Sequence, residues 1–79
     1  MDRVYSVTVR IASAEAAKDF VGIVSAFPVE MDLRSGRYVV DAKSILGILS
    51  LDSTQDMRLD VYADDITEIK TALKDYVIE

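Results

Sequence analysis

Serine hydroxyls and carboxylates are the side chains of this 79-residue chain that could take part in chemistry, because it contains no histidine and no cysteine. Without histidine there is no imidazole general base and no imidazole ligand for a metal ion. Without cysteine there is no thiol nucleophile, disulfide or thiolate metal site. The sequence has no phosphate-binding glycine loop, nucleophile elbow or cleft with paired carboxylates. We therefore predict no catalytic residue, no metal site and no cofactor.

Ser13 directly precedes Ala14-Glu15-Ala16-Ala17, a segment typical of a helix start. A serine at the N-cap accepts a hydrogen bond from a first-turn amide and contributes about 1 kcal/mol relative to alanine. A serine hydroxyl without an adjacent base is a poor nucleophile. The residues therefore favour a structural role for Ser13.

The carboxylates of Asp64, Asp65 and Glu68 form a local acidic cluster. This cluster lacks the oxygen spacing and the glycine of a calcium-binding loop. Asp65 and Glu68 instead match a capping box, and acidic residues are favourable at the start of a helix. We predict that the cluster opens a helix and holds no metal ion.

Strands are predicted from the alternation of apolar and polar residues. The alternation covers residues 4–11, 29–34 and 57–62, and Tyr38-Val39-Val40 is a further predicted strand. Gly36 can take the positive φ of a tight turn, so residues 29–34 and 38–40 should form a hairpin.

Helices are predicted from apolar stripes with helical spacing. One stripe follows Ser13 and should end near Ala26, because Pro28 forbids its continuation. A second stripe covers residues 66–77. The short apolar run 44–50 is ambiguous, because its period fits a strand or a helix.

The order of these elements predicts one α+β domain over residues 1–79. We expect a four-stranded, mostly antiparallel sheet with helices on one face and solvent on the other. Seven polar residues are predicted to cover the open face: Thr8, Arg10, Glu30, Asp32, Arg34, Arg58 and Asp60.

The composition limits the classes of partner. Nine basic and 14 acidic residues give a net charge of −5, which argues against binding to a nucleic-acid backbone. No apolar stretch reaches the roughly 20 residues that span a bilayer, and the N-terminal residues do not resemble a signal peptide. We therefore expect a cytoplasmic protein without a membrane or nucleic-acid partner. A domain this small cannot enclose a large active site, so its function should lie on its surface.

Residues 41–51, Asp-Ala-Lys-Ser-Ile-Leu-Gly-Ile-Leu-Ser-Leu, closely resemble the regulatory-serine segment of HPr, the phosphocarrier of the bacterial phosphotransferase system. In that family the pattern Lys-Ser-Ile-Met-Gly-(Val/Ile)-Met-Ser-Leu opens a short second helix. The resemblance covers nearly the whole chain. It implies the HPr open-faced β-sandwich, with three helices over a four-stranded antiparallel sheet. It also implies that the ambiguous run is a helix.

A second signature of the family is missing. HPr carries Gly-(Leu/Ile)-His-Ala-Arg-Pro before its first helix, where the histidine accepts phosphate and the arginine steadies it. An ungapped alignment places Ser13 at the histidine, Glu15 at the arginine and Ala16 at the proline. A serine phosphoester is a poor onward phosphate donor, and an anionic Glu15 repels phosphate. We therefore predict that this chain does not carry phosphate as HPr does.

The resemblance assigns further roles around residue 44. Ser44 matches the regulatory serine that a dedicated kinase phosphorylates in some bacteria, and it is also a predicted N-cap. Ile45, Leu46 and Leu49 match the patch on which HPr docks enzyme I, transporters and a transcriptional regulator. Ile48 is predicted to belong to the core.

The sequence thus favours a non-enzymatic, HPr-like regulatory or protein-interaction role, controlled by phosphorylation of Ser44. The partners implied are proteins: HPr kinase, a transcriptional regulator or transport-system components. One alternative is a phosphoryl carrier that uses Ser13, Glu15 or Asp19 as its acceptor. Another is a degenerate paralogue whose fold serves an unrelated binding role.

Overall fold

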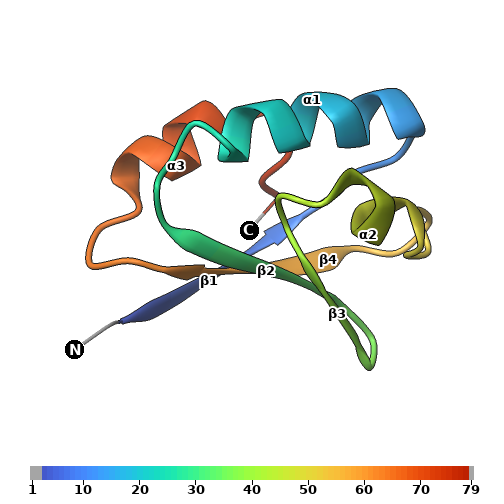
Figure 1. Ribbon diagram of the computed structural model, residues 1–79, viewed down its shortest axis with the longest axis horizontal. Helices are drawn as coiled ribbons and strands as arrows, with labels where there is room; N and C mark the ends of the chain where they lie inside the picture. The colour runs from blue at the N-terminus through green and yellow to red at the C-terminus, as the bar shows by residue number, and fades with distance from the viewer. Residues whose placement is uncertain (1–2, 79) are drawn as a thin grey trace.

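The computed structural model describes residues 3–78. It consists of a four-stranded sheet with three helices on one face (Figure 1). The elements are β1 (Val4–Val9), α1 (Ala14–Val24), β2 (Glu30–Ser35), β3 (Tyr38–Asp41), α2 (Ile45–Leu49), β4 (Met57–Tyr62) and α3 (Thr67–Ala72). The α+β open-faced sandwich is therefore confirmed. Met1, Asp2 and Glu79 lie outside the described residues, and the extent of the domain, residues 1–79, stays a prediction.

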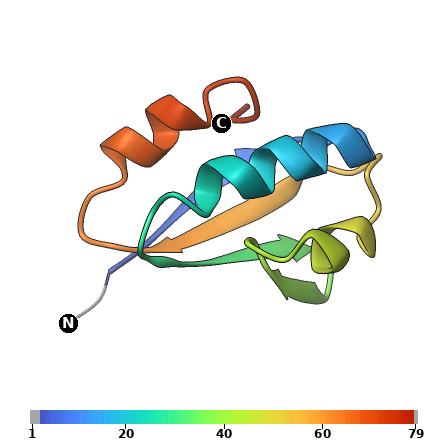
Figure 2. The same ribbon diagram turned by 45° about the horizontal axis from the view of Figure 1, so that its top comes forward.

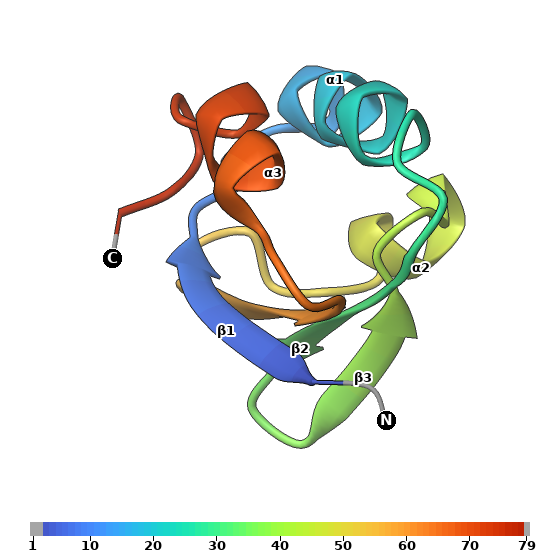
Figure 3. The same ribbon diagram turned by 90° about the vertical axis from the view of Figure 1, so that its left-hand side faces the viewer.

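The strand order is β1-β4-β2-β3, and every neighbouring pair is antiparallel. The last strand, β4, therefore lies inside the sheet between β1 and β2, and β3 lies at one edge. Figure 3 shows all three helices on the same side of the sheet, which leaves the other face open.

The β2–β3 hairpin forms as predicted. Ser35 pairs with Tyr38 across a two-residue loop, Gly36-Arg37. Gly36 has φ +59, and no other described residue has a positive φ. A positive φ at the first loop residue alone is the pattern of a type II′ turn, which glycine accepts without strain.

The core lies between the sheet and the helices. The inward residues of the strands meet Ala17, Phe20 and Val24 of α1, together with Ile48, Ile69 and Leu73. The alternation read from the sequence therefore identifies the buried face of β1, β2 and β4. Burial of these apolar side chains supplies the main stabilisation of the fold.

Several predicted boundaries are wrong by a few residues. β1 ends at Val9, although Ile11 is buried as the alternation requires. α1 ends at Val24, two residues before the predicted end near Ala26, because the Ala26 and Phe27 amides bond only three residues back, to Ile23 and Val24, in a tighter turn.

The final helix differs most from its prediction. α3 covers only Thr67–Ala72, and its N-cap, Ile66, makes no side-chain cap hydrogen bond. Asp65 instead accepts hydrogen bonds from the Thr67 amide (2.9 Å) and hydroxyl (2.7 Å). The predicted capping box is therefore wrong, because Asp65 closes a local turn one residue earlier.

Residues 76–78 form a strap along the outer edge of β1, although the predicted helix extended to Val77. The Arg10 amide donates to the Tyr76 carbonyl and the Ile78 amide to the Thr8 carbonyl, both at 2.9 Å. Val77 bridges to Val9 between them. The strap therefore extends the sheet by a short antiparallel segment. Figure 2 shows the chain turning back after α3, and Figure 3 shows the C-terminal segment running down toward the edge of the sheet at β1.

Candidate functional site

The start of α1 and the short helix α2 border a hollow of about 90 Å³. Its lining includes Ser13 and Ala14 on one side and Ile48, Leu49 and Leu51 on the other. The fold thus brings together Ser13 and Leu49, two candidate residues far apart in sequence. Ser44 and Leu46 do not line this hollow.

Ser13 is the N-cap of α1. Its backbone is extended, and its hydroxyl accepts a hydrogen bond of 3.0 Å from the Ala16 amide. The nearby Glu15 is exposed in the first turn of the same helix. Arg10, just before the helix, is paired with Asp56 at 2.7 Å. A phosphate on Ser13 would therefore lie near the anionic side chain of Glu15 in the first turn of the helix, which would repel it.

Ser44 is the N-cap of α2, as predicted. Its hydroxyl accepts from the Gly47 amide at 3.1 Å, and its side chain is half-buried. The preceding turn is fixed by Asp41, which accepts from the Lys43 amide at 2.9 Å. The Lys43 ammonium donates to the Phe27 carbonyl at 2.6 Å, just beyond α1. Lys43 thereby links the start of α2 to the end of α1.

The apolar residues of α2 divide between core and solvent. Ile48 is buried and Ile45 half-buried, whereas Leu46 is 78% and Leu49 50% exposed. Gly47 lies against β3, where a Cβ added to it would come within 3.0 Å of the Val40 Cβ. This close approach turns Leu46 and Leu49 outward, and the two leucines form an exposed apolar surface on a five-residue helix.

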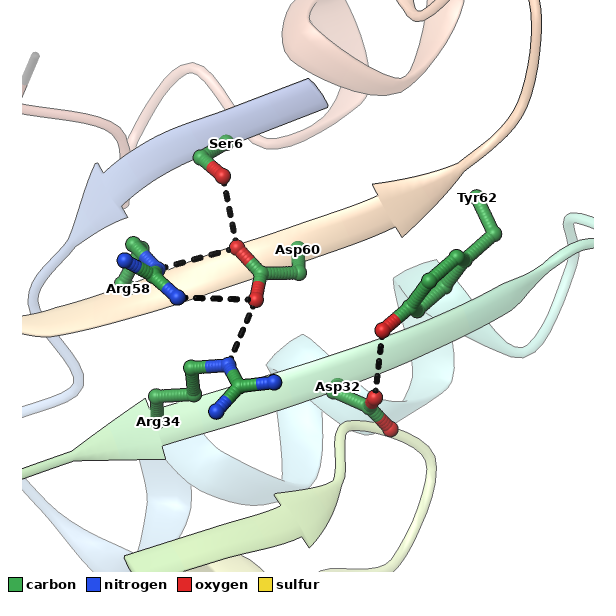
Figure 4. Close-up of polar contacts among 6 residues, drawn as sticks. All are labelled: Ser6, Asp32, Arg34, Arg58, Asp60 and Tyr62. Carbon is green, nitrogen blue, oxygen red and sulfur yellow. Dashed lines mark hydrogen bonds and ion pairs between the residues drawn. The ribbon is translucent and has the colours of Figure 1, made fainter. Parts of the chain in front are cut away.

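The open face of the sheet holds a polar cluster that sequence reasoning missed (Figure 4). The Asp60 carboxylate accepts from the Ser6 hydroxyl and from the Arg34 Nε, both at 2.6 Å. It also pairs with the Arg58 Nε at 3.0 Å. Asp60 was expected to face solvent, but it is only 3% exposed. Asp60 lies on the open face as predicted, but β4 is an inner strand, so neighbouring side chains cover this carboxylate.

The environment of Asp60 determines its charge. Burial alone would raise the pKa of the carboxyl, but the hydrogen bonds from Ser6, Arg34 and Arg58 outweigh it and lower the pKa. Beside this cluster, the Tyr62 hydroxyl donates to Asp32 at 3.0 Å, and this bond raises the pKa of Tyr62. Asp60 is thus held as a charged, fully bonded acceptor, which suits a structural role.

Within residues 3–78, no group of three or more histidine, cysteine, aspartate or glutamate side chains could hold a metal ion. None of the helices in that range has the length and apolar character needed to cross a bilayer.

The class of protein is an open-faced α+β sandwich in which the first two helices meet at one end of the sheet. The sequence model of the PTS-HPr family, described as "PTS HPr component phosphorylation site", matches residues 7–77, so the chain belongs to the HPr family of the phosphotransferase system. Proteins of this family are phosphocarriers that interact with other components of that system.

A solved structure supports this assignment. The crystal structure titled HPr-C-His, from Thermoanaerobacter tengcongensis, is similar with a TM-score of 0.75 and 33% sequence identity. The similarity covers 90% of this chain and 88% of that chain. A search of curated proteins gives no match.

Proposed function

We propose that this HPr-family protein acts by binding other proteins, without carrying phosphate on a histidine, and that phosphorylation of Ser44 controls its binding surface. The observation that carries the proposal is the combination of a chain without histidine and an exposed surface on α2. This surface, formed by Leu46 and Leu49 with Ile45 beside them, corresponds to the docking patch of HPr and is present in this chain. The partners proposed are HPr kinase, a transcriptional regulator or transport-system components.

The surroundings of Ser13 support the loss of carrier activity. Its hydroxyl accepts the cap hydrogen bond from the Ala16 amide, and an unactivated serine hydroxyl is a poor nucleophile. Of the alternative carboxylate acceptors, Asp19 already accepts a hydrogen bond from the Tyr76 hydroxyl. Glu15 is exposed in the first turn of α1, so the labelling experiment below distinguishes it from Ser13 as an acceptor.

Ser44 is well placed to change the surface on α2. A kinase would transfer the γ-phosphoryl group of ATP to the Ser44 hydroxyl, releasing ADP and the hydroxyl proton. The product carries about −1.5 to −2 charges. These charges would stand two residues before the exposed Leu46, next to the exposed carboxylate of Asp41. An apolar partner surface would then have to approach a concentrated negative charge, so we expect phosphorylation to weaken its binding.

Incubation with bacterial HPr kinase and ATP tests the Ser44 assignment. We expect stoichiometric labelling of the wild type and none of Ser44→Ala. Ser50→Ala is the matched control, because Ser50 caps the other end of α2 and donates to the Gly47 carbonyl at 2.6 Å. It should be labelled like the wild type. Labelling that survives Ser44→Ala, or an unlabelled wild type, would contradict the assignment.

Incubation with enzyme I and phosphoenolpyruvate tests the predicted loss of carrier activity. We expect no stoichiometric labelling of the chain. Label that hydroxylamine removes would instead identify an acyl phosphate, as on Glu15 or Asp19. Label that resists hydroxylamine would identify a phosphoserine and point to Ser13.

A further inference from the structure

We infer that a second copy of this chain pairs with the outer edge of β3, antiparallel and with Val39 opposite Val39 of the second copy. β3 is the end strand of the sheet, and among the described residues no strand pairs with its outer side. The strap of residues 76–78 covers part of the opposite edge, on β1. The β3 edge also exposes apolar side chains, since Tyr38 is 68% and Val39 47% exposed. An open edge of this kind is a template for another strand.

The backbone of β3 selects the register of the pair. Residues flanking a two-residue hairpin loop bond to each other, and bonding then alternates along the strand. The Ala42 amide donates to the Met31 carbonyl at 3.0 Å, which continues this alternation from Tyr38. The backbone groups of Val39 and the amide of Asp41 therefore point toward the open edge.

A dimer centred on Val39 satisfies these groups. The two Val39 residues exchange a reciprocal pair of hydrogen bonds, and each Asp41 amide reaches the Arg37 carbonyl of the second copy. The Asp41 carbonyl already accepts from the Ser44 amide at 3.0 Å, so it is not needed for the pairing. A shift of the register by one residue would place Val39, whose backbone groups point to the open edge, opposite a residue whose backbone groups already bond to β2. The hydrogen bonds between the copies would then be lost.

The charges of the edge are complementary in this same register. Arg37 lies opposite Asp41 of the second copy, and the two-fold symmetry repeats this pair at the other end. Within one chain, Asp41 stands opposite Asp32 on β2, which is an unfavourable pair of like charges. An arginine from the second copy would offset that repulsion. On the helix-facing side, Tyr38 would lie opposite Val40, an aromatic and β-branched pair that stabilises sheets.

The contact is small, because each copy contributes one four-residue strand and its flanking residues. Stable complexes typically bury about 1,600 Å². We therefore expect a weak dimer that forms at high protein concentration.

Sedimentation velocity over a concentration series tests the dimer. We expect Arg37→Asp to raise the dissociation constant about tenfold, because it turns an attractive pair into a repulsive one at both ends. Asp41→Arg should do the same. An equimolar mixture of the two variants should associate as well as the wild type, since each repels itself but complements the other. Lys18→Asp, the same charge change at an exposed site on α1, is the control and should leave the constant unchanged.

Amide hydrogen exchange gives a second readout. Exchange at the Val39 amide should slow as the wild-type concentration rises, and should not do so in Arg37→Asp. Circular dichroism of each variant verifies its fold. A wild type that stays monomeric at millimolar concentration would overturn the inference, as would a dimer that Arg37→Asp leaves unchanged. Neither result would bear on Ser44, whose labelling is measured separately.

Discussion

The Asp60 carboxylate ties three strands together from one position. It bonds to Ser6 on β1, to Arg34 on β2 and to Arg58 on its own strand. A change of register between these strands would leave a buried charge without its donors, and this is costly. We interpret Asp60 as a residue that fixes the alignment of the sheet.

Stability in acid tests this role. The pKa of Asp60 lies below its unfolded value of about 3.9, so the carboxylate contributes stability above about pH 4. That contribution is lost as the pH falls through the folded pKa. At neutral pH we expect Asp60→Asn to lower the free energy of unfolding by about 2 kcal/mol. The difference between the two proteins should shrink toward about pH 3.

Urea denaturation at both pH values measures the difference. Asp52 and Asp65 also have lowered pKa values, through hydrogen bonds from Thr54 and Thr67, but they remain in both proteins and cancel. A difference that is independent of pH would show that the charge of Asp60 does not matter.

Single residues were predictable where their role is local. Ser13 is an N-cap because of the residues that follow it, and a local sequence pattern reveals this. The burial of Asp60 depends on β4 lying between β1 and β2, and no local pattern gives the strand order. The signal available was two charges of opposite sign at Arg58 and Asp60, two positions apart on one strand face.

Two glycines in helices, Gly22 on α1 and Gly47 on α2, are expected to affect stability in opposite directions when replaced by alanine. Gly22 lies on α1 with nothing within 4 Å of an added Cβ, whereas Gly47 on α2 is in close contact with Val40 and Ser44. We expect Gly22→Ala to stabilise the protein by about 0.5–1 kcal/mol, because alanine has the higher helix propensity. Gly47→Ala should destabilise it by about 1–3 kcal/mol, because α2 must move away from β3. Thermal unfolding of both variants provides the measurement. Equal effects would show that the close contact between Gly47 and Val40 does not hold α2 against β3.

Periodicity predicted the elements well and their ends poorly. The strands and α1 lie where the alternation and the apolar stripe place them. α2 required the family resemblance, because a short apolar run interrupted by one glycine fits either type of structure. The last helix was overextended: Tyr76 and Val77 continue the apolar stripe, but they pack on α1 and β1 as a strap. Tertiary contacts there override a helical pattern.

The strap closes the molecule through Tyr76, which joins the C-terminal region to α1. Its ring packs edge-on against Phe20 with centroids 5.7 Å apart, and its hydroxyl donates to Asp19. This bond raises the pKa of Tyr76 to about 12. We expect Tyr76→Phe to cost about 1 kcal/mol and Tyr76→Ala about 2–3 kcal/mol. In Tyr76→Ala the Arg10 and Ile78 amides should also lose their protection from hydrogen exchange. Protection that persists would show that the strap holds without this anchor.

The layered architecture of the molecule could be predicted from the order of its strands and helices. The identity of the two edge strands of the sheet could not. Helices that interrupt antiparallel strands predict helices on one face, and the sheet has that form. Which strands are outermost, and what lies along them, depends on contacts such as Arg10 to Tyr76 that join distant parts of the chain.

The strap also determines how far association can proceed. Sheets with two open edges can add copies at both sides without limit, which is the route to fibres. Here one flank of the sheet is already occupied by the chain itself at Val77. Copies that join through β3 use their fully open edge in the pair itself, and the partly covered β1 edge that remains on each copy disfavours further addition.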